Sequence, residues 1–93
     1  MIYKVQHNGN SIERVLRYPR GITVDNDGNV YVTGCNSSNV VVISPDGQRH
    51  KQLLSSKDGL VEPHVLDYER STNKLLVVNR RDIAFLFDVS RGQ

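Results

Sequence analysis

Few residues of this 93-residue chain have types and spacings that could support chemistry, and most of them are basic. Arg17, Arg20, Arg80 and Arg81 could contact phosphate groups, and Tyr18 could stack on a nucleic-acid base. The formal net charge is only +2, however, and a rim of solvated arginines has the same composition. These residues are therefore candidates for binding, and we expect a protein partner ahead of RNA.

An acidic stretch is the second candidate. Asp25, Asp27 and Asn29, with Gly28 between them, resemble the start of a calcium-binding EF-hand loop. The glycine stands at the fourth position of that loop instead of the sixth, and the twelfth position lacks glutamate. The stretch is therefore predicted to be a turn between two strands, with Gly28 at its left-handed position.

Catalytic and metal-binding residues are otherwise sparse. His64 stands alone, whereas a zinc site needs at least three protein ligands. Cys35 has no neighbouring histidine to activate its thiol. The chain also lacks a G-x-S-x-G nucleophile turn and a phosphate-binding glycine loop. We predict no catalytic residue, no metal and no cofactor.

Short apolar or alternating segments, separated by turn residues, must position these side chains. No segment keeps a helical period, so the prediction is an all-β fold. The strands are predicted at Ile2–Val5, Ile12–Leu16, Gly21–Asp25, Val30–Thr33, Val40–Ser44, Arg49–Leu54, Val65–Tyr68, Lys74–Val78 and Ile83–Val89.

The strand pattern repeats along the chain. Pro19–Ser44 corresponds to Pro63–Asp88 at a spacing of 44 residues, and Gly9–Leu16 corresponds to Gly47–Leu54 at a spacing of 38. A unit of about 40–45 residues with four strands is the period of a β-propeller blade. Labelled a to d from the axis outward, the strands run c-d, then a-b-c-d, then a-b-c.

The predicted blades divide the chain into three parts. Residues 1–17 end one blade, residues 18–55 form a complete antiparallel blade, and residues 56–93 begin the next. Closed propellers have about four to eight blades, so we expect a partial propeller that further blades or other copies complete. We expect the chain to be a fragment of a longer propeller.

The run P-R-G-I-T-V-D…D-G-N-V-Y-V…N-V-V-V-I-S-P-D-G, within Pro19–Gly47, resembles the NHL repeat. The resemblance is looser over Pro63–Asp88, where Val65 stands at the usual glycine. It implies a six-bladed propeller like the C-terminal domain of tripartite-motif (TRIM) proteins, which would select the protein or RNA target of a ubiquitin ligase. We therefore predict a non-catalytic interaction module. Ligase chemistry needs the zinc-binding quartets of a RING domain, and one cysteine and three histidines cannot supply them.

The same resemblance leaves a second function open, because NHL-type propellers also occur in enzymes. A lactonase-like hydrolase or an amidating-type lyase would require a metal at the central channel. The resemblance implies that His64, or an inward-pointing amide such as Asn79, would be among its ligands.

Strand order predicts where a partner would bind. In an antiparallel meander, alternate connections emerge at opposite ends, so residues 17–20, 34–39, 55–64 and 79–82 share one end. That end holds five basic and three acidic residues and the longest loops, which usually carry recognition. The candidate binding residues there are Arg17, Tyr18, Arg20, Asn36, Asn39, His64, Asn79, Arg80 and Arg81.

The cellular location follows from other features of the sequence. The chain has no apolar run of about 18 residues, so we predict no membrane span. Met1–Asn10 has no apolar segment typical of a secretion signal, and a single cysteine cannot form an internal disulfide. We therefore expect a cytoplasmic protein.

Overall fold

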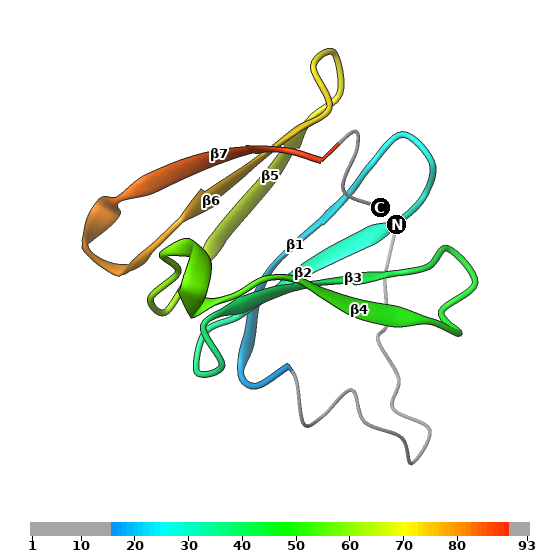
Figure 1. Ribbon diagram of the computed structural model, residues 1–93. Helices are drawn as coiled ribbons and strands as arrows, with labels where there is room; N and C mark the ends of the chain where they lie inside the picture. Colours follow the sequence, from blue (N-terminus) through cyan, green and yellow to red (C-terminus); the bar gives the residue numbers. More distant parts are fainter. Residues whose placement is uncertain (1–15, 90–93) are drawn as a thin grey trace.

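The computed structural model describes residues 16–89, apart from the side chain of Asp82, and it is all-β as predicted. One antiparallel sheet contains four strands in chain order, and a second contains three (Figure 1). The first sheet consists of β1 (Pro19–Val24), β2 (Val30–Gly34), β3 (Asn39–Ile43) and β4 (His50–Leu54). The second consists of β5 (Val65–Glu69), β6 (Lys74–Val78) and β7 (Ala84–Asp88).

The seven strands match the predicted ones within two residues at each end. The largest difference is at β1, because Pro19 and Arg20 were predicted to lie in a loop and instead belong to the strand. Pro19 pairs with Gly34, and an irregularity in the register precedes Ile22. Proline is tolerated there because it is the first residue of an edge strand. The strand predicted at Ile2–Val5 and all but the last residue of that at Ile12–Leu16 lie outside the described residues.

Two of the predicted loops contain short 3-10 helices, η1 (Ser56–Asp58) and η2 (Arg80–Asp82). Ser55 and Asp58 form a capping box around η1: Ser55 Oγ accepts from Lys57 N, and Asp58 Oδ2 accepts from Ser55 N at 2.9 Å. Leu60 follows and is fully buried. The capping box and this buried side chain together give the long connection between the sheets a defined shape.

The turns at the opposite strand ends also follow the repeat. Gly28 has φ +87° in the β1–β2 turn, the left-handed conformation that glycine adopts without steric cost. The β5–β6 turn lacks glycine, and Asn73 takes the left-handed position there with φ +55°. Asparagine is one of the few other residues that occupy this region readily.

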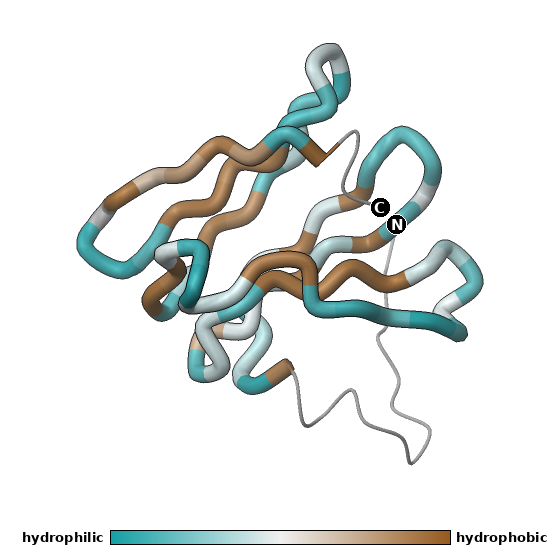
Figure 2. The backbone as a smooth tube through the Cα atoms, viewed as in Figure 1, coloured by the Kyte–Doolittle hydropathy of each residue, from teal (hydrophilic) through white to brown (hydrophobic). Residues whose placement is uncertain are grey.

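The main core lies between the two sheets. Strand residues on the facing sides of the sheets meet there, and the rings of Tyr31 and Tyr68 stack with centroids 6.4 Å apart. Figure 2 shows that apolar segments follow most strands of both sheets, whereas β4 and the turns opposite the loop connections are largely hydrophilic. The buried residues of this cluster are Tyr31, Val40, Leu60, Leu66, Tyr68, Leu75, Val77 and Val89.

The sheets come closest at their first strands. A Cβ atom at Gly21 of β1 would lie 3.0 Å from both the carbonyl oxygen of His64 and Cβ of Leu66. Only glycine permits that approach, because the facing atoms belong to the backbone and the root of a core side chain. Two sheets that face each other and converge at their first strands are neighbouring blades of a partial β-propeller. We call β1–β4 blade 1 and β5–β7 blade 2.

Candidate binding surface

Four connections emerge at one end of the blades, as the strand order predicted (Figure 1). They are the approach to β1, the β2–β3 loop, the β4–β5 connection with η1, and the β6–β7 connection with η2. We call this the loop end and the opposite side the turn end. Seven of the nine predicted binding residues have exposed or half-buried side chains at the loop end, namely Arg17, Tyr18, Arg20, Asn36, His64, Arg80 and Arg81.

The loop end concentrates unusual backbone geometry. Tyr18 (φ +55°), Ser38 (+51°), Glu62 (+45°) and Arg81 (+71°) all adopt left-handed conformations without being glycine. Among the described residues, the only other non-glycine case is Asn73 at the turn end. Such conformations cost of order 1–3 kcal/mol each and persist only where the surroundings fix them, which is common at ligand-binding sites.

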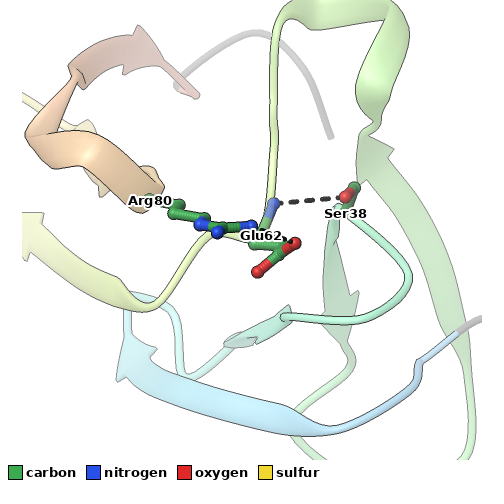
Figure 3. A network of polar contacts seen from close by, with 3 residues as sticks. All are labelled: Ser38, Glu62 and Arg80. Carbon is green, nitrogen blue, oxygen red and sulfur yellow. Dashed lines mark hydrogen bonds and ion pairs between the residues drawn. The ribbon is translucent and has the colours of Figure 1, made fainter.

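Polar contacts between the blades fix two of these residues. The backbone N–H of Glu62 donates to Ser38 Oγ at 3.2 Å, which joins the β4–β5 connection to the β2–β3 loop (Figure 3). Arg80 Nη1 donates to Glu62 Oε2 at 3.0 Å, and the Arg80 N–H lies 3.2 Å from the carbonyl oxygens of Val61 and Glu62. Three loops from two blades are thereby linked into one surface.

The approach to β1 is fixed in the same way. Arg17 N donates to Ser37 Oγ at 3.0 Å, and the Arg17 carbonyl accepts from Asn36 N at 3.2 Å. These contacts hold Tyr18 with its side chain 58% exposed. The Arg20 guanidinium lies 5.7 Å from the centroid of the Tyr18 ring, within cation–π range. An aromatic side chain and a cation are thus presented together to solvent.

Two predicted binding residues are buried instead. Asn39 Nδ2 donates to Gln52 Oε1 at 2.8 Å, and Asn39 Oδ1 accepts from Ser37 Oγ at 2.7 Å. Asn79 Nδ2 donates to the carbonyl of Gly59 at 2.9 Å. Both amides stand at strand ends, where Asn39 accepts from Ser37 of the β2–β3 loop and Asn79 donates to Gly59 of the β4–β5 connection. The buried Oδ1 of Asn79 has no hydrogen-bond partner among the described residues. Asn39 and Asn79 therefore contact the neighbouring loops from inside the protein, and their side chains are not exposed to a partner.

His64 is half-buried, and its backbone N–H donates to the Val78 carbonyl at 3.0 Å. Within residues 16–89, no three histidine, cysteine, aspartate or glutamate side chains are grouped so that they could hold a metal ion. Cys35 is a free, half-buried thiol. The described part of the chain therefore brings no pair of histidine, cysteine, aspartate or glutamate side chains to His64 that would complete a three-ligand site.

The turn end differs in its electrostatics. Asp25 is buried and accepts hydrogen bonds from the backbone N–H groups of Asp27 and Asn29, both at 2.9 Å, and from Tyr31 Oη at 2.8 Å. Burial alone would raise the pKa of Asp25, but the hydrogen bonds from Asn29, Tyr31 and Asp27 outweigh it and lower the pKa from its ordinary value of 3.8. The pKa of Tyr31 is raised by burial and by the Asp25 carboxylate. The acidic stretch is thus a turn, as predicted.

Sequence reasoning missed Ser38 and Glu62, which connect the loops. Glu62 precedes Pro63, and the residue before proline normally takes an extended conformation. The observed φ of +45° at Glu62 runs against that rule. No pattern in the sequence indicates either the conformation or the partner, because the two residues are 24 positions apart and in different repeats.

Comparison with known proteins agrees with the fold. A family model described as SBBP, beta-propeller repeat, matches residues 14–35, a segment that contains β1, its turn and β2. No curated protein matches the chain.

Among the described residues, no helix is long and apolar enough to cross a membrane. The β-propeller repeat suggests an interaction module.

Proposed function

We propose that the chain is a non-catalytic module that binds a protein partner through its loop end. Its role would resemble that of the NHL propellers of TRIM-type ubiquitin ligases, which select a substrate while a RING domain elsewhere supplies the ligase chemistry. The observation that carries the proposal is the set of left-handed loop residues, Tyr18, Ser38, Glu62 and Arg81, two of which, Ser38 and Glu62, are joined by a hydrogen bond between loops. Strained loops that are fixed from two blades form a preorganised surface.

The exposed side chains on this surface indicate the chemistry of the partner. Tyr18 and Val61 are 58% and 55% exposed, and Arg17, Arg20 and Arg81 are exposed in the same set of loops. Tyrosine and arginine are the residue types that most often dominate binding energy at protein interfaces. Arginines beside apolar groups favour an acidic peptide segment that also carries an apolar or aromatic side chain.

The proposal excludes catalysis by this part of the chain. An enzyme would need a nucleophile with its base, or a metal with at least three ligands. A metal-dependent hydrolase or lyase remains the competing function, and the test includes it. We propose no metal or cofactor for the loop end.

The experiment is a selection of peptides from a random library displayed on phage, followed by affinity measurements with the enriched sequences. We expect acidic residues around an apolar one, and a loss of affinity of about tenfold for both Tyr18→Ala and Arg81→Glu. Arg70→Glu is the matched control, because Arg70 is an exposed arginine at the turn end. Its effect should stay below about twofold, the part due to long-range charge alone.

Three outcomes contradict the proposal. Equal losses for Arg81→Glu and Arg70→Glu would mean that the loop end is not the binding surface. Tighter binding of single-stranded poly(U) RNA than of any selected peptide, with a steep salt dependence, would make RNA the ligand. Hydrolysis of a lactone in the presence of Zn²⁺ or Ca²⁺, abolished by His64→Ala, would make the protein an enzyme.

A further inference from the structure

Exposed apolar side chains and a cation meet at one corner of the loop end, on blade 2. Val61 and Ile83 are 55% and 54% exposed. The Val61 carbonyl accepts from the Arg80 N–H at 3.2 Å, and the Ile83 carbonyl accepts from the Asn79 N–H at 2.8 Å. Two residues with large exposed side chains therefore flank Asn79 and Arg80, where η2 begins. We call Val61, Arg80 and Ile83 the η2 corner.

Arg80 is the cation of this corner. Its backbone N–H lies 3.2 Å from the carbonyl oxygens of Val61 and Glu62, so the root of the side chain has a fixed position. The guanidinium is joined to the Glu62 carboxylate by a hydrogen bond from Nη1 to Oε2 at 3.0 Å (Figure 3). A guanidinium has five N–H donors, so this one hydrogen bond uses a small part of its capacity.

Glu62 indicates which chemical group the η2 corner recognises. Its carboxylate comes from a different loop, 18 residues earlier in the sequence, and already binds the Arg80 guanidinium. A ligand carboxylate can make the same hydrogen bond, and a bidentate one would make two. An arginine between exposed aliphatic side chains therefore suits a ligand that carries a carboxylate next to an apolar group.

The Glu62 side chain can leave Arg80 without separating the loops. The contact that joins the blades uses the Glu62 backbone N–H, which donates to Ser38 Oγ at 3.2 Å. In the ion pair itself, the side chains of Glu62 and Arg80 are 44% and 60% exposed. Pairs this exposed change an equilibrium constant by about fivefold at most, so another carboxylate can displace Glu62 at little cost.

We propose that the η2 corner is the subsite for a carboxylate with an adjoining apolar side chain, and that Glu62 competes with the ligand for it. The ligand carboxylate takes the place of Glu62 on Arg80, while its apolar side chain packs on Val61 and Ile83. This inference rests on the proposed function, to which it adds a defined position, two adjacent groups in the ligand, and an internal competitor. The carboxylate is either that of an acidic side chain or that of a chain end.

The first test is an NMR titration of the isotope-labelled protein with capped tetrapeptides. The probe acetyl-Gly-Asp-Leu-Gly-amide carries both groups, and acetyl-Gly-Asn-Leu-Gly-amide lacks the charge. The first should shift the amide resonances of Val61, Arg80 and Ile83 and bind about fivefold more tightly than the second. Tighter binding of acetyl-Gly-Gly-Leu, with its free carboxyl group, would identify a chain end as the source of the carboxylate. Equal affinity of the charged and neutral probes, or shifts confined to other residues, would overturn the subsite.

Glu62→Gln tests the internal competitor, because it removes the charge and keeps the size of the side chain. The dissociation constant of the Asp-containing probe should fall about threefold, and the gain should vanish in a background of Arg80→Ala. Glu69→Gln is the matched control, because Glu69 is an exposed glutamate at the turn end of blade 2 and its replacement changes the net charge equally. An equal gain in both glutamine variants, or none in Glu62→Gln, would contradict the competition.

The apolar half of the subsite has its own test. Ile83→Thr keeps a branched side chain but makes it polar, and it should weaken binding of the Leu-containing probe about threefold. Binding of acetyl-Gly-Asp-Gly-Gly-amide, which has no apolar side chain, should not change. Leu86→Thr is the matched control, since Leu86 is 61% exposed but lies further along β7. Equal losses for the two probes would mean that Ile83 does not contact the leucine.

Two results distinguish the η2 corner from the loop end as a whole. If peptides from the phage selection bind and Arg81→Glu weakens them, while Glu62→Gln and Ile83→Thr change nothing, a partner binds the loop end outside the η2 corner. That result overturns the subsite and leaves the proposed function standing. If the selection yields no peptide and none of the capped probes shifts an amide resonance at the loop end, both fail.

Discussion

The two ends of the blades use polar residues in opposite ways. At the turn end, Asn26 Nδ2 reaches from blade 1 to Tyr68 Oη (3.3 Å), the Arg70 carbonyl (3.1 Å) and Asn73 Oδ1 (3.2 Å) of blade 2. Beside it, buried Asp25 accepts from several donors. At the loop end the blades are linked by the Glu62 backbone N–H and the half-buried Ser38 hydroxyl, and the buried polar side chains there, Asn39 and Asn79, are neutral amides.

Under the proposed function, this difference separates the residues that stabilise the fold from those that bind a partner. The buried carboxylate at the turn end cannot be replaced without leaving donors unpaired in a site of low dielectric. Loop-end side chains such as Tyr18 and Arg81 project outward, and few internal contacts depend on them. Substitutions at the loop end should therefore change binding with little effect on folding, and the predictions below test that contrast.

The largest effect is expected for Asp25→Ala. It leaves the Tyr31 hydroxyl and two backbone N–H groups without their acceptor, which should lower the free energy of unfolding by about 3 kcal/mol in urea titrations. Asp46→Ala is the matched control, because Asp46 accepts from Ser44 and Gln48 in the β3–β4 turn but is exposed. The control should have a much smaller effect. Similar losses in both variants would mean that burial does not distinguish the two turns.

The same carboxylate predicts a pH dependence. The pKa of Asp25 is lowered in the folded state, so its contribution is fully present above the unfolded value and is lost as the pH falls through the folded pKa. The difference in unfolding free energy between the wild type and Asp25→Asn should shrink below about pH 4. Asp46 and Glu69 also have lowered pKa values, but both chains share them and they cancel in the difference. A difference that stays constant from pH 6 to pH 2 would contradict the assignment.

At the loop end, Arg81→Gly should stabilise the protein, whereas Asp25→Ala destabilises it. Arg81 has φ +71°, a conformation that costs a side-chain-bearing residue about 1–2 kcal/mol and glycine almost nothing. The greater freedom of glycine in the unfolded chain offsets part of that gain, so we expect stabilisation of about 0.5–1 kcal/mol in thermal unfolding. Arg80→Gly, one residue earlier and without positive φ, should destabilise the protein. If Arg81→Gly also destabilises it, the conformation is not a source of strain.

The fold could be predicted from the sequence because the alternation of apolar residues in strands and the residues that form turns are local features of the chain. Strand alternation and the 44-residue spacing indicate both blades, and the Asp25–Asn29 turn follows from its glycine. Which positions are buried could not be predicted in the same way. Ile22 and Leu66 are chemically alike and occupy equivalent positions, and only the presence of a neighbouring blade makes one exposed and the other buried.

The candidate site was predictable in position but not in detail. Strand order alone places the loops at one end, which is why most candidate residues lie there. The side-chain directions at Asn39 and Asn79 depend on loops that pack over them, and the contact from Glu62 to Ser38 joins different repeats. Such long-range contacts leave no periodic signal, so the sequence predicts neither the burial of Asn39 and Asn79 nor the contact between Glu62 and Ser38.

The smallest change in the free energy of unfolding is expected when the Glu62–Arg80 ion pair is removed. Its side chains are 44% and 60% exposed, and pairs of this kind contribute about 0.2–1 kcal/mol. Arg80→Ala should therefore cost less than Ser38→Ala, which removes the acceptor of the Glu62 N–H and should cost about 1 kcal/mol.

Salt separates the two variants, because only the ion pair is screened at 1 M ionic strength. The cost of Arg80→Ala should fall there, while that of Ser38→Ala should persist. Should Arg80→Ala instead cost as much as Asp25→Ala, the loop end would be as essential to folding as the turn end, and the contrast between them would fail.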